Sequence, residues 1–471
     1  MERTPAGSAH GQGPRGVPSG SRGQPDLRAL ALRAVSEPTL MIAALLLVVV
    51  LSTAWHVNYS RSAGIDFYQF WLVGHAVEEG SVTNVYSLEG REELTRIGAR
   101  LASTPGGSRR LVEATRTREI FENFSTPFLY ACFGRFFTGD YDGDYARYQV
   151  VCLLVLAAAV GWFGRALGYG ASATFLLVLV VVLGFRPALS DLLVGNVSRL
   201  ELGTVALALG VLRSTRPWRE VAAGALLGLL LVFKPNTVLV VLLLPLLWIM
   251  SRRWGRLLRH GAGMALGAAI AIGVSWLHFG SLRPWFDWFA AMGRIEAESN
   301  LASQSGNFSL ARALMESGVP DPSLALSAGL SVAAAVALWL GARRAAPVST
   351  GPGVATSRPG DVLFTAEVTT AAIGLGIPLL GFHLAWMHYF VLALPLMACA
   401  LRPAPPAASG SRAWTLRWIL GIAGTLLLFG GPLYLFRGSG PPPPALQYSI
   451  GTAILLFVAL VDVARGADAS S

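Results

Sequence analysis

One acidic residue follows the first long apolar run of the chain directly, in the stretch AGIDFYQFW (63–71). A carboxylate such as Asp66 can take the proton from an attacking hydroxyl group, and the neighbouring Tyr68 and Trp71 could pack against sugar rings or guide a lipid. The same carboxylate could instead cap an amphipathic helix at 67–77, because aspartate accepts hydrogen bonds from the free N–H groups of a first turn. Asp66 is thus a candidate catalytic base, with helix capping as the alternative.

Amide and cationic groups recur in later connections between apolar runs. Such groups can bind a phosphate and stabilise the charge that develops on it as it leaves. Plainer interpretations exist: a lysine near a helix end often extends to the lipid headgroups, a histidine among aromatic residues can belong to an interfacial belt, and an Asn-x-Ser triplet can cap a loop. The candidates for substrate or phosphate binding are Arg186, Asn196, Lys234, Asn307 and His388.

The composition places most of the chain in a membrane. Of its 471 residues, 53% are hydrophobic and 14% are charged, and the mean hydropathy is +0.54. Soluble domains carry about 25% charged residues. Apolar runs of roughly 17–25 residues match the thickness of a bilayer, and a helix satisfies its own backbone groups in hydrocarbon. We therefore expect an all-α, polytopic membrane bundle without a large soluble domain.

The arginines predict which loops face the cytoplasm. Residues 1–37 are rich in Gly, Pro, Ser and Arg, as in a disordered tail, and short arginine-bearing loops mark the cytoplasmic side. One threading puts these loops on the side of that tail, with about twelve transmembrane helices in a single domain at 38–464 and a second cytoplasmic tail at 465–471. The predicted spans are 39–56, 146–163, 171–185, 192–212, 218–233, 236–250, 261–279, 324–341, 362–381, 384–401, 416–436 and 446–463.

Two long segments, 57–145 and 280–323, fall on the external side in this threading. The first carries Asp66 and amphipathic helices, among them STPFLYACFGRFF (125–137), which is too short to span and should be a surface or re-entrant helix. A Lys-Pro pair beginning at Lys234 interrupts two short runs, and the carbonyl that a proline frees must line a cavity. The candidate groups of separate external connections therefore meet at one membrane face, as expected of a functional site.

Neither a cofactor nor a nucleic-acid partner is indicated. Cys132, Cys152 and Cys399 lie in apolar surroundings without metal-ligand spacing. The acidic stretch GDYDGDY (139–145) resembles a divalent-cation loop but lacks the ligand set of a calcium site, so a divalent cation stays an open alternative. The net charge of +10 comes from loop arginines, as topology control requires. Membrane lipids are the expected surroundings.

An external site with one acid, cations and amides suits sugar transfer from a lipid-linked donor. Nucleotide sugars are absent outside the cytoplasm, so an activated sugar must arrive on a lipid phosphate. Asp66 would take the proton of the acceptor hydroxyl, while cations would stabilise the departing phosphate. A single base on the face opposite the leaving group implies inversion at the anomeric carbon.

Six stretches also occur in an order that resembles a known family, the GT-C type membrane glycosyltransferases that use polyprenyl-phosphate sugars, specifically glycosyltransferase family 87. The resemblance covers about residues 60–400 and implies a GT-C architecture. It implies that Asp66 is the catalytic acidic residue, that Lys234 and His388 lie near the donor phosphate, and that Asn307 belongs to a late external-loop element. The stretches are GIDFYQFWLVGHAVEEGSVTNVY, FSTPFLYACFGRFF, GNVSRLELG, FKPNTVLVVLLLPLL, GNFSLARAL and WMHYFVLALPL.

We therefore expect an inverting glycosyltransferase of a bacterial plasma membrane, with its site facing the periplasm or exterior. It would move a sugar, with mannose as the expected one, from polyprenyl phosphate to a cell-envelope glycolipid or glycan. A polyprenyl-phosphate arabinosyltransferase is an alternative. A transporter or flippase of lipid-linked sugar is another, although transporters usually show paired broken helices in two related halves. An O-antigen-ligase-like enzyme would rely on arginines and a histidine in the loop 280–323.

Overall fold

The computed structural model describes residues 62–465 with internal gaps. Every element in this part of the chain is a helix, and one isolated antiparallel bridge joins Asn307 to Trp386. The all-α prediction is therefore confirmed for these residues. The expected tail at 1–37, the first expected span at 39–56 and most of the tail at 465–471 lie outside them. The gaps are 81, 83, 105–106, 119–120, 122–123, 215, 295–305, 345–358, 404–410 and 431–445.

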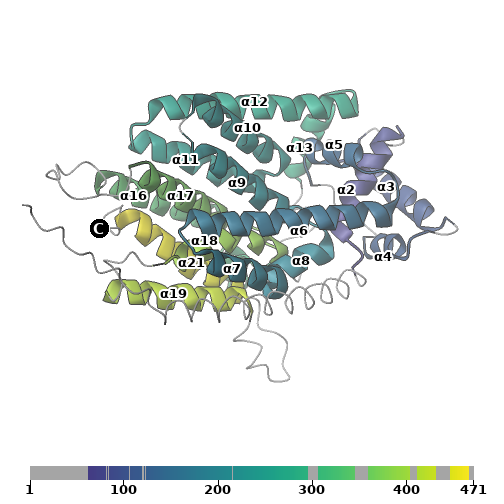
Figure 1. Ribbon diagram of the computed structural model, residues 1–471. Coiled ribbons are helices and arrows are strands. Elements are labelled where there is room, and N and C mark those ends of the chain that lie inside the picture. The colour runs from purple at the N-terminus through teal and green to yellow at the C-terminus, as the bar shows by residue number, and fades with distance from the viewer. Residues whose placement is uncertain are drawn as a thin grey trace, which may run out of the picture. The chain divides into compact units, whose positions relative to one another are not determined.

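Short helices of the expected external loop gather at one end of the long helices (Figure 1). Ser87, Ser108 and Thr126 each cap one of them, because each side chain accepts a hydrogen bond from a backbone N–H of the first turn. The stretch at 125–137 forms a helix of ten residues, as expected of a segment too short to span. These helices are α2 (Ile65–Glu78), α3 (Leu88–Ala102), α4 (Arg109–Thr117) and α5 (Pro127–Phe136).

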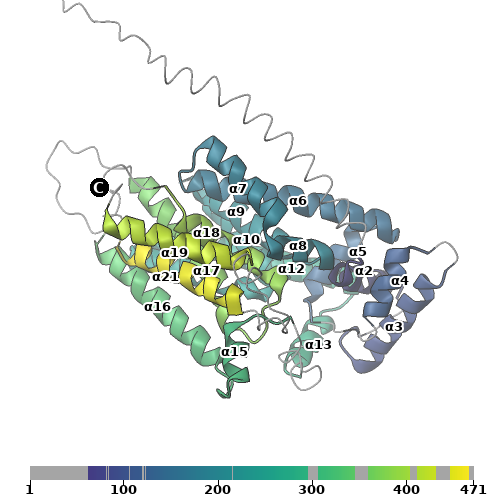
Figure 2. The ribbon, with the colours of Figure 1, turned by 90° about the horizontal axis from the view of Figure 1, so that it is seen from below.

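The second expected external loop contributes two more short helices. In the view of Figure 2, α13 (Arg283–Met292) lies between α15 (Leu310–Glu316) and α3. The indole nitrogen of Trp288 on α13 donates a hydrogen bond of 3.1 Å to the carbonyl of Phe124, just before α5. The two segments that are expected to be external are therefore in direct contact.

Within the described residues, five helices are long and apolar enough to cross a membrane, and a bent pair would make a sixth. The pair is α7 (Ala171–Gly184) and α8 (Arg186–Val194), bent by 53°. The predicted count of twelve is therefore not confirmed, although every expected run from 146–163 onward includes a helix among its described residues. The five are α6 (Tyr141–Ala166), α12 (Trp254–Phe279), α16 (Ser323–Arg344), α17 (Pro359–Gly381, with its apolar part from Val362) and α21 (Leu446–Arg465).

The other expected runs are shorter helices, because breaks divide them. They are α9 (Ser198–Leu212), α10 (Pro217–Phe233), α11 (Val238–Met250), η3 (Met387–Ala393) with α18 (Leu394–Ala400), and α19 (Arg412–Leu428). A Lys-Pro break separates α10 from α11, and the 3-10 helix η3 directly precedes α18.

Helices α10 and α12 are in close backbone contact, and helix α17 is deeply buried. A Cβ atom on Gly224 or Gly228 of α10 would lie 2.1 or 2.2 Å from a backbone carbonyl oxygen of α12, so only glycine lets these two backbones approach so closely. Of the apolar window in α17, 78% of residues are buried, against 22% in α12 and α16. Helix α17 is therefore the most buried of the long apolar helices, and α11, α16, α18 and α21 pack against it.

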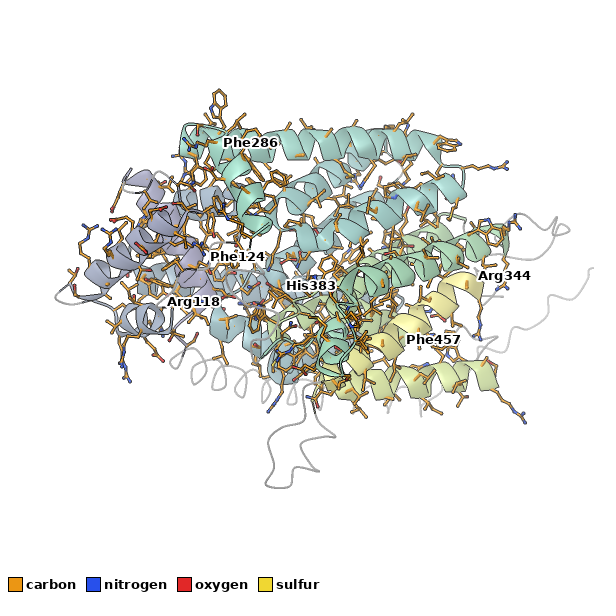
Figure 3. The ribbon with its side chains drawn as sticks, turned by 180° about the vertical axis from the view of Figure 1, so that it is seen from behind. Arg118, Phe124, Phe286, Arg344, His383 and Phe457 are labelled. Carbon is orange, nitrogen blue, oxygen red and sulfur yellow. The ribbon has the colours of Figure 1, made fainter. Side chains whose placement is uncertain are left out.

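The two ends of the helices differ in the predicted membrane side of their loops. In Figure 3, Arg118, from the expected external loop, and Arg344, from an expected cytoplasmic loop, lie at opposite ends. The separation of Arg118 and Arg344 agrees with the predicted threading, and the membrane orientation itself stays a prediction.

Buried ion pairs also join helices of the bundle: Arg256 contacts Glu367 at 3.0 Å and Arg417 contacts Asp462 at 2.9 Å.

Candidate active site

Asp66 is the second residue of α2 and is buried, with 7% of its surface exposed. Its Oδ1 accepts a hydrogen bond of 2.6 Å from an Nη atom of Arg118, and its Oδ2 accepts one of 2.7 Å from Nδ2 of Asn196. The residue at the N-cap of α2 is Gly64. The capping interpretation of Asp66 is therefore wrong: both carboxylate oxygens are bound by side chains from distant parts of the chain.

Asn196 reaches Asp66 because the turn between α8 and α9 approaches α2 very closely. Gly195 has φ 73°, and a Cβ atom there would lie 2.7 Å from the Cβ of Phe67. Only glycine combines this backbone conformation with this contact. The hydroxyl of Tyr148 also donates a hydrogen bond of 2.5 Å to the backbone carbonyl of Asn196. The backbone of Asn196 is therefore held in place both by its own turn and by α6.

Lys234 sits at the break between α10 and the 3-10 helix η1 (Pro235–Thr237). Its Nζ donates 2.8 Å to Oδ1 of Asn196 and lies 3.1 Å from Oε1 of Glu201, a fully buried carboxylate of α9. It also stands 4.4 Å from the ring centroid of Tyr389. Lys234 therefore points into the protein, and the alternative of a lysine extended to lipid headgroups is wrong.

The break at Lys234 is also tied to the external loop. The hydroxyl of Thr126, at the start of α5, donates a hydrogen bond of 3.0 Å to the carbonyl of Phe233. A buried carbonyl at a helix end needs such a partner. The STPF stretch therefore satisfies the broken helix, which explains why these two distant sequence elements belong to one site.

His388 lies near the same carboxylate oxygen of Asp66 that Asn196 binds. Its Nε2 lies 3.7 Å from Oδ2 of Asp66, which is longer than a hydrogen bond. Asn307 fixes the segment that carries this histidine, because its Nδ2 donates 2.5 Å to the carbonyl of His383 and its Oδ1 accepts 2.9 Å from the N–H of Ala385. Asn307 is therefore a support for the His388 segment.

Three candidates from the sequence take other places. Tyr68 and Trp71 are 0% and 2% exposed, and Trp71 donates 3.0 Å to Oδ2 of Asp144. The expectation that these rings contact a sugar is not met, because the core of the external helices covers them. Arg186 opens α8 beside Gly430 at the end of α19: a Cβ atom on Gly430 would lie 3.3 Å from Cδ of Arg186. That contact does not bring it to Asp66.

The surroundings of Asp66 hold the pKa of its carboxyl below the usual value for aspartate. Burial acts to raise this pKa, and the positive charge of Arg118 is the largest of the effects that together outweigh it. His388, the hydrogen bond from Asn196 and the charge of Lys234 act in the same direction as Arg118. Asp66 is therefore an ionised carboxylate at neutral pH, as a proton acceptor must be.

Two residues of this cluster were not identified from the sequence. Arg118 was one of several arginines in a polar loop, where nothing in the local pattern distinguishes it. Glu201 could have been identified from the sequence, since a lone acid inside the apolar run at 192–212 is rare unless it has a partner. We call Asp66, Arg118, Asn196, Lys234, Glu201 and His388 the Asp66 cluster.

In the acidic stretch at 139–145, Asp144 is bound by groups of the protein itself. Asp144 is fully buried and accepts hydrogen bonds from the indole of Trp71, at 3.0 Å, and from the backbone N–H of Thr138, at 2.9 Å. Across the residues that the structure describes, no group of three His, Cys, Asp or Glu side chains is placed to hold a metal ion. Asp144 instead anchors the start of α6 to α2.

The family comparison matches the central part of the chain. The model described as Glycosyltransferase family 87 matches residues 126–357. The chain belongs to glycosyltransferase family 87. This family 87 protein is therefore a glycosyltransferase, and its long apolar helices fit a membrane protein. The match includes Asn196, Lys234 and Glu201 and lies between Asp66 and His388 in the sequence. No curated protein and no solved structure matches the chain.

Proposed function

We propose that this family 87 glycosyltransferase moves a sugar from polyprenyl phosphate to a hydroxyl group of a cell-envelope glycolipid or glycan, at the external face of a bacterial plasma membrane. Mannose is the sugar we propose. The observation that carries the proposal is the Asp66 cluster: an ionised, nearly buried carboxylate lies among cations where the external helices meet the long apolar helices. Such a position suits a substrate whose reacting group is attached to a lipid.

The proposed reaction needs one proton acceptor and one stabilised leaving group. As the acceptor oxygen attacks the anomeric carbon, its O–H bond breaks and Asp66 takes the proton. The bond between that carbon and the phosphate oxygen breaks at the same time, and its electron pair leaves with polyprenyl phosphate. Cations near the leaving oxygen stabilise this charge. Attack from the face opposite the phosphate inverts the anomeric configuration.

The geometry around His388 supports a hydroxyl group at this place. The 3.7 Å between its Nε2 and Asp66 Oδ2 is too long for a direct hydrogen bond. An acceptor hydroxyl that bound both groups would donate its one proton to the carboxylate and accept a hydrogen bond from the imidazole N–H. His388 therefore serves as a positioning residue for the acceptor in this proposal.

The alternatives differ in how this family membership bears on them. A flippase or an O-antigen-ligase-like enzyme is disfavoured, since neither is expected of glycosyltransferase family 87. An arabinosyltransferase remains compatible with the same base and the same leaving group, because only the sugar changes. The choice between mannose and arabinose therefore needs a direct assay.

The test uses the full-length protein purified in detergent. Polyprenyl-phosphate mannose and polyprenyl-phosphate arabinose, each radiolabelled in the sugar, are supplied separately with a membrane-lipid extract as the source of acceptors. We expect labelled glycolipid from the mannose donor and a product of inverted anomeric configuration by NMR. Transfer from a nucleotide sugar alone, or retention of configuration, would contradict the proposal.

A further inference from the structure

We propose that Arg118 binds the phosphate of the lipid-linked donor, and that in the empty enzyme the same guanidinium group is paired with Asp66. Binding of the donor then moves Arg118 from the carboxylate to the phosphate and frees the base for the acceptor hydroxyl. This inference rests on the proposed function and deepens it, by assigning a residue and an order of events.

The first support is the position of Arg118. It follows α4 directly, on the expected external loop (Figure 3), and it forms an ion pair with the candidate base itself, at 2.6 Å. Its side chain is 23% exposed, against 16% for Lys234 and 8% for His388. Of these three side chains, Arg118 is therefore the one that an incoming headgroup can reach most easily.

The second support is the way in which the other cation is already engaged. The Nζ atom of Lys234 lies 3.1 Å from the fully buried Glu201 and donates 2.8 Å to Asn196. Moving Lys234 to a phosphate would leave the Glu201 carboxylate buried without its counter-charge, which is strongly unfavourable. Lys234 therefore suits a fixed role beside Asn196, whereas the partner of Arg118 loses its own charge during the reaction.

The third support is the charge balance of the transfer step. Before transfer, Asp66 is negative and the donor phosphodiester carries one negative charge. As the acceptor proton moves to Asp66, the carboxyl becomes neutral, and the broken C–O bond leaves a second negative charge on the phosphate. A guanidinium group within reach of both anions follows the charge from one to the other. Arginine suits this role, because its planar N–H groups bind a carboxylate or a phosphate through paired hydrogen bonds.

The same exchange accounts for the weak basicity of Asp66 in the empty site. The charge of Arg118 is the main influence that lowers the pKa of this buried carboxyl, and a carboxylate with a lowered pKa is a weaker base. When the phosphate takes Arg118, that influence is withdrawn. The base then becomes effective only when the donor is present.

Binding of a lipid phosphate, measured without turnover, tests this inference. Full-length protein in detergent is titrated with a short-chain prenyl phosphate, and with the prenol of equal chain length to isolate the phosphate contribution. Free inorganic phosphate forms a third arm, which shows whether the lipid chain is needed. We expect Arg118→Gln to weaken prenyl-phosphate binding by roughly ten- to a hundred-fold and to leave prenol binding unchanged. Arg118→Lys should retain part of the affinity.

The Asp66→Asn variant separates exchange from a purely structural ion pair. Asparagine keeps the shape of the side chain but no longer competes for the guanidinium group, so Asp66→Asn should bind prenyl phosphate several-fold more tightly than the natural protein. If Arg118 only supports the fold, removal of its partner should weaken binding or leave it unchanged. Either of those results for Asp66→Asn would overturn the exchange.

Two further variants control for folding and for general electrostatics. Arg116→Gln removes a positive charge from an exposed position of the same helix, and it should bind prenyl phosphate as the natural protein does. Arg118→Gln combined with Asp66→Asn leaves no buried carboxylate without a partner, so it should fold even if the single arginine variant does not. This double variant should still bind poorly, and wild-type affinity in it would overturn the assignment of Arg118.

The outcome is independent of the proposed sugar transfer. Arg118-dependent binding without any detectable transfer would support the phosphate site and contradict the proposed function. Transfer that occurs with Arg118-independent binding of prenyl phosphate would do the reverse.

Discussion

Asn196 donates a hydrogen bond of 2.7 Å to Asp66, which lies 130 positions earlier in the chain. The same amide accepts a hydrogen bond from Lys234 through its oxygen. One side chain therefore links the external helix α2 to the broken helix α10. Because an amide presents a donor on one side and an acceptor on the other, it is the type of group that can stand between a carboxylate and an ammonium.

The pH dependence of transfer should follow the state of Asp66. Its pKa lies below that of ordinary aspartate, so the ionised base is present at neutral pH and is lost only when the pH falls through that lowered pKa. The acidic limb of the kcat/KM profile should therefore lie below about pH 4, the usual range for aspartate. The stability that Asp66 contributes should be lost over the same acidic range.

Replacing Arg118 should move that acidic limb in a defined direction. Arg118→Gln removes the main charge that lowers the Asp66 pKa, so the limb should shift to higher pH, while Arg116→Gln leaves it in place. His388, Asn196 and Lys234 still surround the carboxylate in this variant. The profile of kcat/KM against pH, with saturating acceptor, measures the effect. An unshifted limb in Arg118→Gln would mean that Asp66 is not the group that titrates.

The pair Lys234–Glu201 should matter for stability as a unit. Lys234→Met leaves a fully buried carboxylate without its cation at 3.1 Å, and such a loss costs about 3–5 kcal/mol in proteins. The melting temperature in detergent should therefore fall clearly. Lys234→Met combined with Glu201→Met should recover most of it and remain poorly active, because Asn196 still lacks its donor. A single variant that melts like the natural protein would show that the buried pair does not stabilise the fold.

Asn307 should affect the rate without touching Asp66. Asn307→Ala removes the 2.5 Å hydrogen bond to the His383 carbonyl, which Ser309 Oγ also approaches at 3.4 Å, and the acceptor of the Ala385 N–H. A buried group left without its partner costs about 1–3 kcal/mol. The segment that carries His388 should then shift, and displacements near 1 Å can lower a rate about a hundred-fold. Asn307→Asp keeps the acceptor for Ala385 and should be intermediate in kcat. Equal loss in both variants would indicate that the donor to His383 alone decides the position.

The positions of Asp66, Asn196, Lys234 and His388 were predictable in kind from the sequence. Each is a polar group in a connection that the arginine pattern assigns to one membrane face, and few arrangements of helices keep such groups apart. The contacts themselves were not predictable. The approach of α2 to the α8–α9 turn depends on Gly195, one of 52 glycines in the chain, and no local pattern separates it from the rest.

Burial explains the predictions that the structure corrected. Tyr68 and Trp71 have the side chains expected of a sugar platform, but aromatic residues beside a site serve equally well as core, and only the packed structure distinguishes the two.

The number of spans depends on breaks such as the 53° bend between α7 and α8. The predicted run 192–212 also crosses the turn between α8 and α9, which apolar composition does not mark.

The transfer rate of Asp66→Asn tests the central claim most directly. The measurement compares initial rates of sugar transfer from polyprenyl-phosphate mannose by the natural protein and by Asp66→Asn, at saturating donor and with equal melting temperatures confirmed. Loss of a general base should lower kcat by about 10²–10⁴-fold, while prenyl phosphate should bind more tightly than to the natural protein. An Asp66→Asn enzyme with a kcat near that of the natural protein would contradict the assignment of Asp66 as the base.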